Sequence, residues 1–110
     1  MKNIHDYKLY YFLGIGGIGM SALARYFNIH KKNIIGYDKT ESELTKQLVN
    51  EGIQCYYEEK NDIELENILS QYNKDDVLVI YTPAVPKELK EWKFFYERQF
   101  VIKKTFRSIG

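Results

Sequence analysis

Short apolar runs alternate along this chain with segments in which apolar residues recur at the spacing of a helix. The runs at 9–13, 33–37 and 76–82 each predict a strand, because their residues are mostly apolar and rich in β-branched and aromatic side chains. The last run, DVLVIYT, is typical of a central parallel strand that is covered on both faces. Two shorter strands are expected at 54–57 and 100–102.

Four helices are predicted between these strands from apolar residues that lie three or four positions apart. Their apolar stripes are Met20, Leu23, Ala24 and Phe27; Leu44 and Leu48; Leu65, Ile68, Leu69 and Tyr72; and Leu89, Trp92 and Tyr96. We expect Trp92 and the aromatic run at 94–96 to lie in the core rather than to stack on nucleic-acid bases. Strands that alternate with helices predict an α/β fold, here a Rossmann-like three-layer α/β/α domain with a mostly parallel sheet of about five strands.

Several polar residues, with glycine and proline, predict where the helices begin and end. Thr40 and Glu43 fit a capping box, in which each side chain accepts a hydrogen bond from the backbone N–H of the other residue. Gly52 is expected to end that helix in a left-handed conformation, as in a Schellman motif. Asn61 is a candidate cap for the next helix, and Pro86 can serve as the first residue of the last one.

The length and composition suit one globular domain with a hydrophobic core. The chain has 110 residues, of which 45% are hydrophobic and 28% are charged. Its 16 basic and 15 acidic residues give a net charge of +1, which provides no overall field for nucleic acid or a membrane surface. The sequence has no apolar run long enough to span a membrane, and its polar start has no signal-peptide pattern. We therefore expect a soluble, cytoplasmic protein.

The single cysteine and the two histidines offer no reactive or metal-binding pattern. Cys55 cannot form an internal disulfide, and no histidine lies near it in the sequence to activate its thiol. We interpret it as a packing residue in a reducing compartment. His5 and His30 are isolated and lack the spacing of metal ligands, so no metal site is expected.

Residues 14–19, GIGGIG, form a glycine-rich turn between the first predicted strand and the first predicted helix. Gly14, Gly16 and Gly19 match the G-x-G-x-x-G spacing, whose glycines allow a tight turn, close approach of a phosphate to the backbone, and close packing of helix on strand. The start of the helix presents unpaired N–H groups and the positive end of its dipole. This context predicts a phosphate-bearing ligand, with a purely structural turn as the alternative.

Two further segments follow the carboxyl ends of predicted strands. Asp38 comes directly after the second strand, about 20 residues beyond the glycine turn, where a dinucleotide fold uses an acid to bind a nucleoside hydroxyl. The alternative is that Asp38 caps the following turn. Residues 82–84 follow the apolar fourth strand. Because ligands in such sheets bind beyond the carboxyl ends of the strands, we expect the three segments to meet at one edge.

Three stretches of this sequence together resemble the amino-terminal domain of the Mur ligase family: FLGIGGIGMSALARYF, GYDKTESELTKQLVNEGI and VLVIYTPAVP. The similarity extends from about Lys8 to Gly110. In that family the first domain is Rossmann-like but holds UDP-N-acetylmuramate instead of a dinucleotide. The resemblance therefore implies that this chain takes part in building peptidoglycan, and that it binds this nucleotide sugar.

The resemblance also implies which residues bind the nucleotide sugar. The diphosphate would contact the loop and the start of the helix at Gly14, Ile15, Gly16, Gly17, Ile18, Gly19, Met20 and Ser21. The uridine would lie beside Asp38, Lys39 and Thr40, and the same pocket would be lined by Thr82, Pro83 and Ala84.

The family's catalytic equipment is not found in these 110 residues. Members bind ATP through a G-x-x-x-x-G-K-[ST] loop, and no such run occurs here. We therefore expect residues 1–110 to correspond to the first of three domains, with the central ATP-binding and the carboxyl-terminal domains absent. ATP, magnesium and L-alanine would be bound by those other domains. On this reading the segment alone holds no cofactor and is inactive.

The sequence departs from the family pattern at two places. Many members carry Gly-His where this chain has Glu58-Glu59, so a histidine contact to the nucleotide cannot be transferred. A Lys-Arg pair common in the family is Lys104-Thr105 here.

Alternative functions remain open at this level. Within the family, GIGGIGMS favours the alanine-adding ligase over the one that recycles the murein tripeptide. Outside it, the glycine turn and Asp38 also fit an NAD(P)-binding domain of an oxidoreductase or redox regulator. A third alternative is an interaction domain that keeps the fold and binds no nucleotide.

Overall fold

Five parallel strands form one sheet at the centre of the structure, a computed structural model that describes residues 2–105. Residues 106–110, the end of the segment that resembles the Mur ligases, lie outside the described part. The strands are β1 (Leu9–Leu13), β2 (Asn33–Tyr37), β3 (Gln54–Tyr56), β4 (Val77–Tyr81) and β5 (Val101–Lys104). Their order in the sheet is β3-β2-β1-β4-β5, and every neighbouring pair is parallel.

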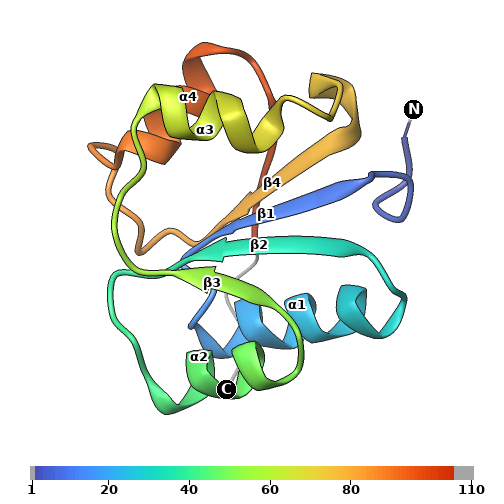
Figure 1. The fold of residues 1–110 in the computed structure, drawn as a ribbon, viewed down its shortest axis with the longest axis vertical. Coiled ribbons are helices and arrows are strands. Elements are labelled where there is room, and N and C mark those ends of the chain that lie inside the picture. The colour runs from blue at the N-terminus through green and yellow to red at the C-terminus, as the bar shows by residue number, and fades with distance from the viewer. Residues whose placement is uncertain (1, 106–110) are drawn as a thin grey trace.

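Four α-helices cover the two faces of this sheet. They are α1 (Ile18–Ile29), α2 (Glu43–Asn50), α3 (Asp62–Leu69) and α4 (Lys90–Glu97), and a short 3-10 turn, η1 (Lys74–Asp76), precedes β4. Helices α1 and α2 lie on one face, and α3 and α4 lie on the other (Figure 1). This arrangement confirms the predicted three-layer α/β/α fold. Within residues 2–105, no helix is long and apolar enough to cross a membrane.

Strand β1 is buried along its whole length because its two faces pack on different helices. On one face Tyr10 stacks on Phe27 of α1, with 4.0 Å between the ring centroids. On the other face Tyr11 meets the edge of Phe95 of α4 at 4.9 Å. Such aromatic pairs add about 0.5–1.5 kcal/mol each beyond the burial of their surface. Alternate residues of this one strand therefore contribute to the two apolar cores of the domain, one on each face of the sheet.

The predicted start of α2 is wrong by two residues. The capping box is formed by Ser42 and Thr45, not by Thr40 and Glu43. Ser42 Oγ accepts the Thr45 N–H at 3.2 Å, and Thr45 Oγ1 accepts the Ser42 N–H at 2.8 Å. Thr45 is fully buried, so its hydroxyl needs partners inside the protein, and this requirement favours Ser42 as the cap. The Thr40 N–H donates instead to Asp38 Oδ1.

The predicted end of α2 and the predicted start of α3 agree with the structure. Gly52 has φ +96°, and the Ile53 N–H donates to the Leu48 carbonyl at 3.0 Å, which confirms the Schellman motif. Asn61 caps α3 together with Glu64, as its sequence position predicts.

Helix α4 differs from the prediction at its start and on one face. It begins at Lys90 rather than Pro86, because residues 86–89 form a turn in which the Leu89 N–H donates to the Pro86 carbonyl at 3.1 Å. Trp92, Phe94 and Phe95 are buried as expected, whereas Tyr96 is 66% exposed. Tyr96 lies at the edge of the buried face, where its ring stacks on Trp92.

Cys55 packs partly buried against the apolar core on the α1 side of the sheet. Burial raises the pKa of its thiol to about 11, so little thiolate is present at neutral pH. This environment supports the interpretation of Cys55 as a packing residue.

The corrected cap of α2 can be tested by substitution. Ser42→Ala should lower the free energy of unfolding by about 1 kcal/mol, because the first turn loses the acceptor for the Thr45 N–H. Thr40→Ala is the matched control and should cost less, since the Thr40 hydroxyl makes no hydrogen bond within residues 2–105. Urea denaturation measures the free energy of unfolding of both variants. A loss of stability in Thr40→Ala equal to or larger than that in Ser42→Ala would support Thr40 as the cap.

Candidate functional site

A cavity of about 600 Å³ lies at the carboxyl ends of the strands. It is bordered by the loop after β1, the end of β2 and the connection between β4 and α4. Its lining residues are Gly14, Gly16, Gly17, Tyr37, Asp38, Lys39, Glu59, Thr82, Ala84, Val85, Pro86 and Leu89. The three segments expected to meet at this edge of the sheet therefore do so around one cavity.

The glycine loop is tied to the end of the neighbouring strand. Gly14 has φ +93°, a conformation that side chains disfavour, and an added Cβ would lie 2.5 Å from Thr82 Cγ2. The N–H groups of Gly14 and Ile15 both donate to the Tyr37 carbonyl, at 2.7 and 3.0 Å. Gly14 thus has the tight-turn role that the motif predicts.

Asp38 connects the glycine loop to the turn after β2. Its Oδ2 accepts the Gly16 N–H at 2.7 Å, and its Oδ1 accepts the Thr40 N–H at 3.1 Å. Asp38 therefore caps its own turn, as the alternative interpretation predicted, and also holds the loop across the cavity. Hydrogen bonds to a charged acceptor contribute about 1.5–3 kcal/mol each, so this contact restrains the loop.

The first turn of α1 presents backbone donors near the cavity. Its N-cap, Gly17, has no side chain to cap the helix. The Ser21 N–H makes the first intrahelical bond, to the Gly17 carbonyl at 2.8 Å. The N–H groups of residues 18–20 precede it and have no intrahelical partner, and the positive end of the helix dipole lies with them. An anionic group such as a phosphate is the natural ligand for this arrangement.

The third glycine of the motif does not have its predicted packing role. Gly19 is exposed on the first turn of α1. Close packing against a glycine occurs instead at Gly36 in β2, where an added Cβ would lie 2.2 Å from Ile15 Cδ1. The side chain of Ile15 is fully buried and fills the space that Gly36 leaves. The loop is therefore anchored in the core by Ile15.

The family of the chain follows from comparison with known proteins. A model of the Mur ligase family, catalytic domain, matches residues 9–105. The chain belongs to the Mur ligase family. Its relatives include UDP-N-acetylmuramate--L-alanine ligases from Flavobacterium psychrophilum, 47% identical over 98% of this chain, and from Christiangramia forsetii, 44% identical over the whole chain. These matches cover 23% and 24% of the relatives' length, so the chain spans about a quarter of them.

A solved Mur ligase has the same fold. The crystal structure of UDP-N-acetylmuramate-alanine ligase MurC from Thermotoga maritima matches 86% of this chain with a TM-score of 0.68 and 28% sequence identity. The match covers 20% of that protein.

The residues predicted to bind a ligand fall into two groups in this Mur ligase chain. Gly14, Gly16, Gly17, Asp38, Lys39, Thr82 and Ala84 line the cavity. The others lie beside it: Ile15, Met20 and Ser21 are buried under the loop, and Ile18, Gly19, Thr40 and Pro83 are exposed around it. Because the side chains of Ile15, Met20 and Ser21 are buried, these three residues could contact a ligand only through their backbone.

Five lining residues were not predicted from the sequence: Tyr37, Glu59, Val85, Pro86 and Leu89. Tyr37, Val85 and Pro86 are direct neighbours of predicted residues, so proximity in the sequence could have indicated them. Glu59 stands where many family members carry the histidine of a Gly-His pair, and that position was the signal that could have indicated it. No pattern around Leu89 points to this edge of the sheet.

A buried carboxylate supports the wall of the cavity that carries Glu59. Glu91 is fully buried, and its Oε2 accepts the Tyr56 hydroxyl and the Lys60 N–H, both at 2.9 Å. Tyr56 is in turn hydrogen-bonded to the hydroxyl of Tyr11 in β1. Burial is the main cause that raises the pKa of Glu91 above its ordinary value. This network links α4 to β3 and β1.

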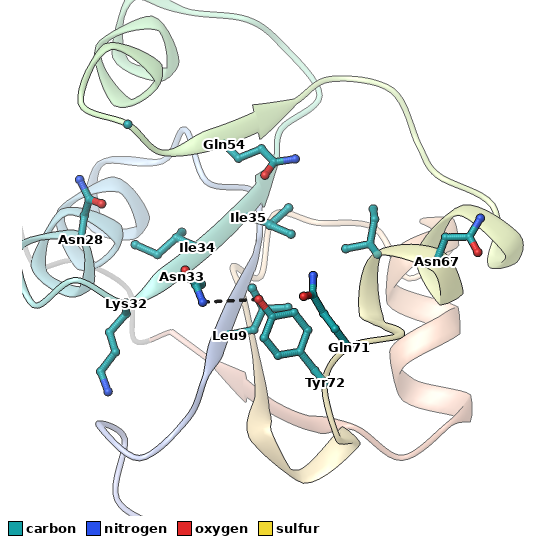
Figure 2. A pocket seen from close by; sticks show the side chains of 12 residues that line it. Leu9, Asn28, Lys32, Asn33, Ile34, Ile35, Gln54, Asn67, Gln71 and Tyr72 are labelled. Carbon is teal, nitrogen blue, oxygen red and sulfur yellow. Dashed lines mark hydrogen bonds between the residues drawn. The ribbon is translucent and has the colours of Figure 1, made fainter.

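A second cavity, of about 420 Å³, lies at the opposite edge of the sheet, where β1, β2 and β3 begin. Figure 2 shows its lining, which includes the amides of Asn28, Asn67 and Gln71 and the ring of Tyr72. Asn33 donates to the Tyr72 hydroxyl at 3.5 Å. This cavity contains none of the residues predicted to bind a ligand.

The close contact between Gly16 and its neighbours predicts the effect of a side chain there. In Gly16→Val a Cβ would lie 2.7 Å from Asp38 Oδ2 and 3.0 Å from Thr45 Cγ2, so we expect a loss of about 1–3 kcal/mol in the free energy of unfolding. The control is Gly17→Ala, whose Cβ would meet nothing nearer than 3.7 Å. Thermal and urea denaturation measure both variants, and equal stability would show that the loop can shift to accommodate a side chain at Gly16.

Proposed function

We propose that this chain is the UDP-N-acetylmuramate-binding part of an ATP-dependent ligase that adds L-alanine to this nucleotide sugar in peptidoglycan biosynthesis. One observation carries the proposal: the glycine loop, Asp38 and residues 82–84 border one cavity in a member of the Mur ligase family. Relatives named UDP-N-acetylmuramate--L-alanine ligase match 98–100% of the chain at 44–47% identity. The recycling ligase and the oxidoreductase have no comparable support.

The cavity offers separate chemistry for the two ends of the ligand. The N–H groups at 18–20 and the dipole of α1 suit the diphosphate. Asp38, Lys39 and Thr40, at the end of β2, suit the uridine. Thr82, Pro83 and Ala84, in the connection after β4, would close the pocket from the other side.

We assign the binding of ATP, magnesium and L-alanine to parts of the ligase other than these 110 residues, which contain no G-x-x-x-x-G-K-[ST] loop. The chain spans about a quarter of its relatives, which leaves room for two further domains. We also infer a cytoplasmic location, which suits a protein with one unpaired cysteine, and we assign the chain no nucleic-acid or membrane partner.

Ligand preference tests the proposal directly. UDP-N-acetylmuramate at 100 times its dissociation constant should raise the free energy of unfolding by about 2.7 kcal/mol, whereas NAD at equal concentration should not change it. Thermal shift and calorimetry measure both effects. A shift with NAD and none with UDP-N-acetylmuramate would favour an oxidoreductase-like domain, and no shift with either would favour an interaction domain. The 110 residues alone should show no ATP hydrolysis and no amide formation.

Asp38 is the residue whose loss should weaken binding through the loop and the uridine together. Asp38→Ala should reduce affinity for UDP-N-acetylmuramate and for free UDP alike by about tenfold or more, because the variant loses both the proposed contact to the uridine and the bond from the Gly16 N–H that holds the glycine loop. Asp75→Ala is the control, since Asp75 lies in η1 before the start of β4, away from the cavity. Unchanged UDP affinity in a folded Asp38→Ala chain would contradict the proposed site.

A further inference from the structure

We propose that Glu59 is the carboxylate that recognises hydrogen-bond donors on the nucleoside part of the ligand, and that Asp38 acts mainly by holding the glycine loop. The inference rests on the proposed function and adds to it a specificity-determining residue. The cavity at the carboxyl ends of the strands is lined by two acidic residues, Asp38 and Glu59.

The two carboxylates differ in the acceptors that they have to offer. Both oxygens of Asp38 are engaged by the chain, Oδ2 by the Gly16 N–H and Oδ1 by the Thr40 N–H. Glu59 uses only Oε1, which accepts the Lys90 N–H at 2.9 Å. Within residues 2–105, its Oε2 has no hydrogen bond or ion pair, and the residue is exposed at the cavity. Glu59 is therefore the acid with a free oxygen for a ligand.

The position of Glu59 is fixed before any ligand binds. Its Oε1 is held by the N–H of the first residue of α4, one of the donors that a helix leaves unpaired. The backbone of the next residue, Lys60, is bonded to the fully buried Glu91, which also accepts the Tyr56 hydroxyl. A side chain restrained at both its tip and its backbone loses little entropy when it binds a ligand.

The chemistry and position of Glu59 suit the nucleoside rather than the phosphates. A carboxylate only accepts hydrogen bonds and repels phosphate oxygens, whereas ribose hydroxyls and the uracil N3–H are donors. Glu59 follows β3, which lies two strands from β1 in the sheet, and two strand spacings amount to about 10 Å. The diphosphate at the loop after β1 and a nucleoside at Glu59 would therefore occupy opposite sides of the cavity.

The decisive substitution is Glu59→Gln, which keeps an oxygen for the Lys90 N–H and replaces the free acceptor with an NH₂ donor. We expect affinity for UDP-N-acetylmuramate and for UDP to fall by about tenfold or more, with the melting temperature of the unliganded chain unchanged. The matched control is Glu58→Gln, the exposed neighbour that does not line the cavity, which should bind both ligands like the unsubstituted chain.

Ligand analogues identify the donor that Glu59 recognises. Titration calorimetry would compare UDP with its 2′-deoxy, 3′-deoxy and N3-methyl analogues in the unsubstituted chain and in Glu59→Gln. The analogue that lacks the recognised donor should bind the unsubstituted chain about tenfold more weakly, and the substitution should weaken it little further. A loss confined to a deoxy analogue assigns the contact to the ribose, and one confined to the N3-methyl analogue assigns it to uracil.

Each other outcome decides against the inference. If Glu59→Gln and Glu58→Gln bind UDP equally well, Glu59 is not the recognising residue and the proposed function stands without it. If affinity and melting temperature fall together in Glu59→Gln, the residue acts only as the cap of α4. If the unsubstituted chain binds no UDP-N-acetylmuramate, the proposed function itself fails and the inference falls with it.

Discussion

The burial of β1 on both faces is the constraint on which the rest of the structure depends. Leu9–Leu13 contributes alternate side chains to two separate cores, so helices must cover both sides of the sheet. Because β1 is parallel to β2 and to β4, the chain has to return along the sheet before each of them, through α1 before β2 and through α3 before β4. The glycine loop begins where β1 ends, at the edge of the sheet where the carboxyl ends of the parallel strands meet. The cavity lies at this edge and is lined in part by the glycine loop.

Much of this fold could be predicted from the sequence because strand and helix patterns are local. The apolar runs gave the positions of the strands, and the order of strands and helices gave the parallel sheet. The cap of α2 was missed because Thr40 and Ser42 both fit a local capping pattern, and the burial of Thr45 decides between them. Tyr96 was missed because helical spacing does not show where the buried face of α4 ends.

The candidate site could be predicted only as far as topology determines it. Strand ends in a parallel sheet meet at one edge, so the convergence of the glycine loop, Asp38 and residues 82–84 needed no structure. The hydrogen bonds that engage both oxygens of Asp38, and the contact of Glu59 with the start of α4, depend on distances between loops. No sequence spacing encodes those distances, and the burial of Glu91 is likewise a product of tertiary packing.

The contact between Ile15 and Gly36 has a consequence for how this sequence can change. The space that a side chain at 36 would need is already filled by Ile15, with 2.2 Å between the added Cβ and Ile15 Cδ1. A larger residue at 36 is therefore compatible only with a smaller one at 15, and that smaller residue would loosen the anchor of the loop. We therefore expect residues 15 and 36 to change together in evolution even though they are 21 positions apart in the sequence.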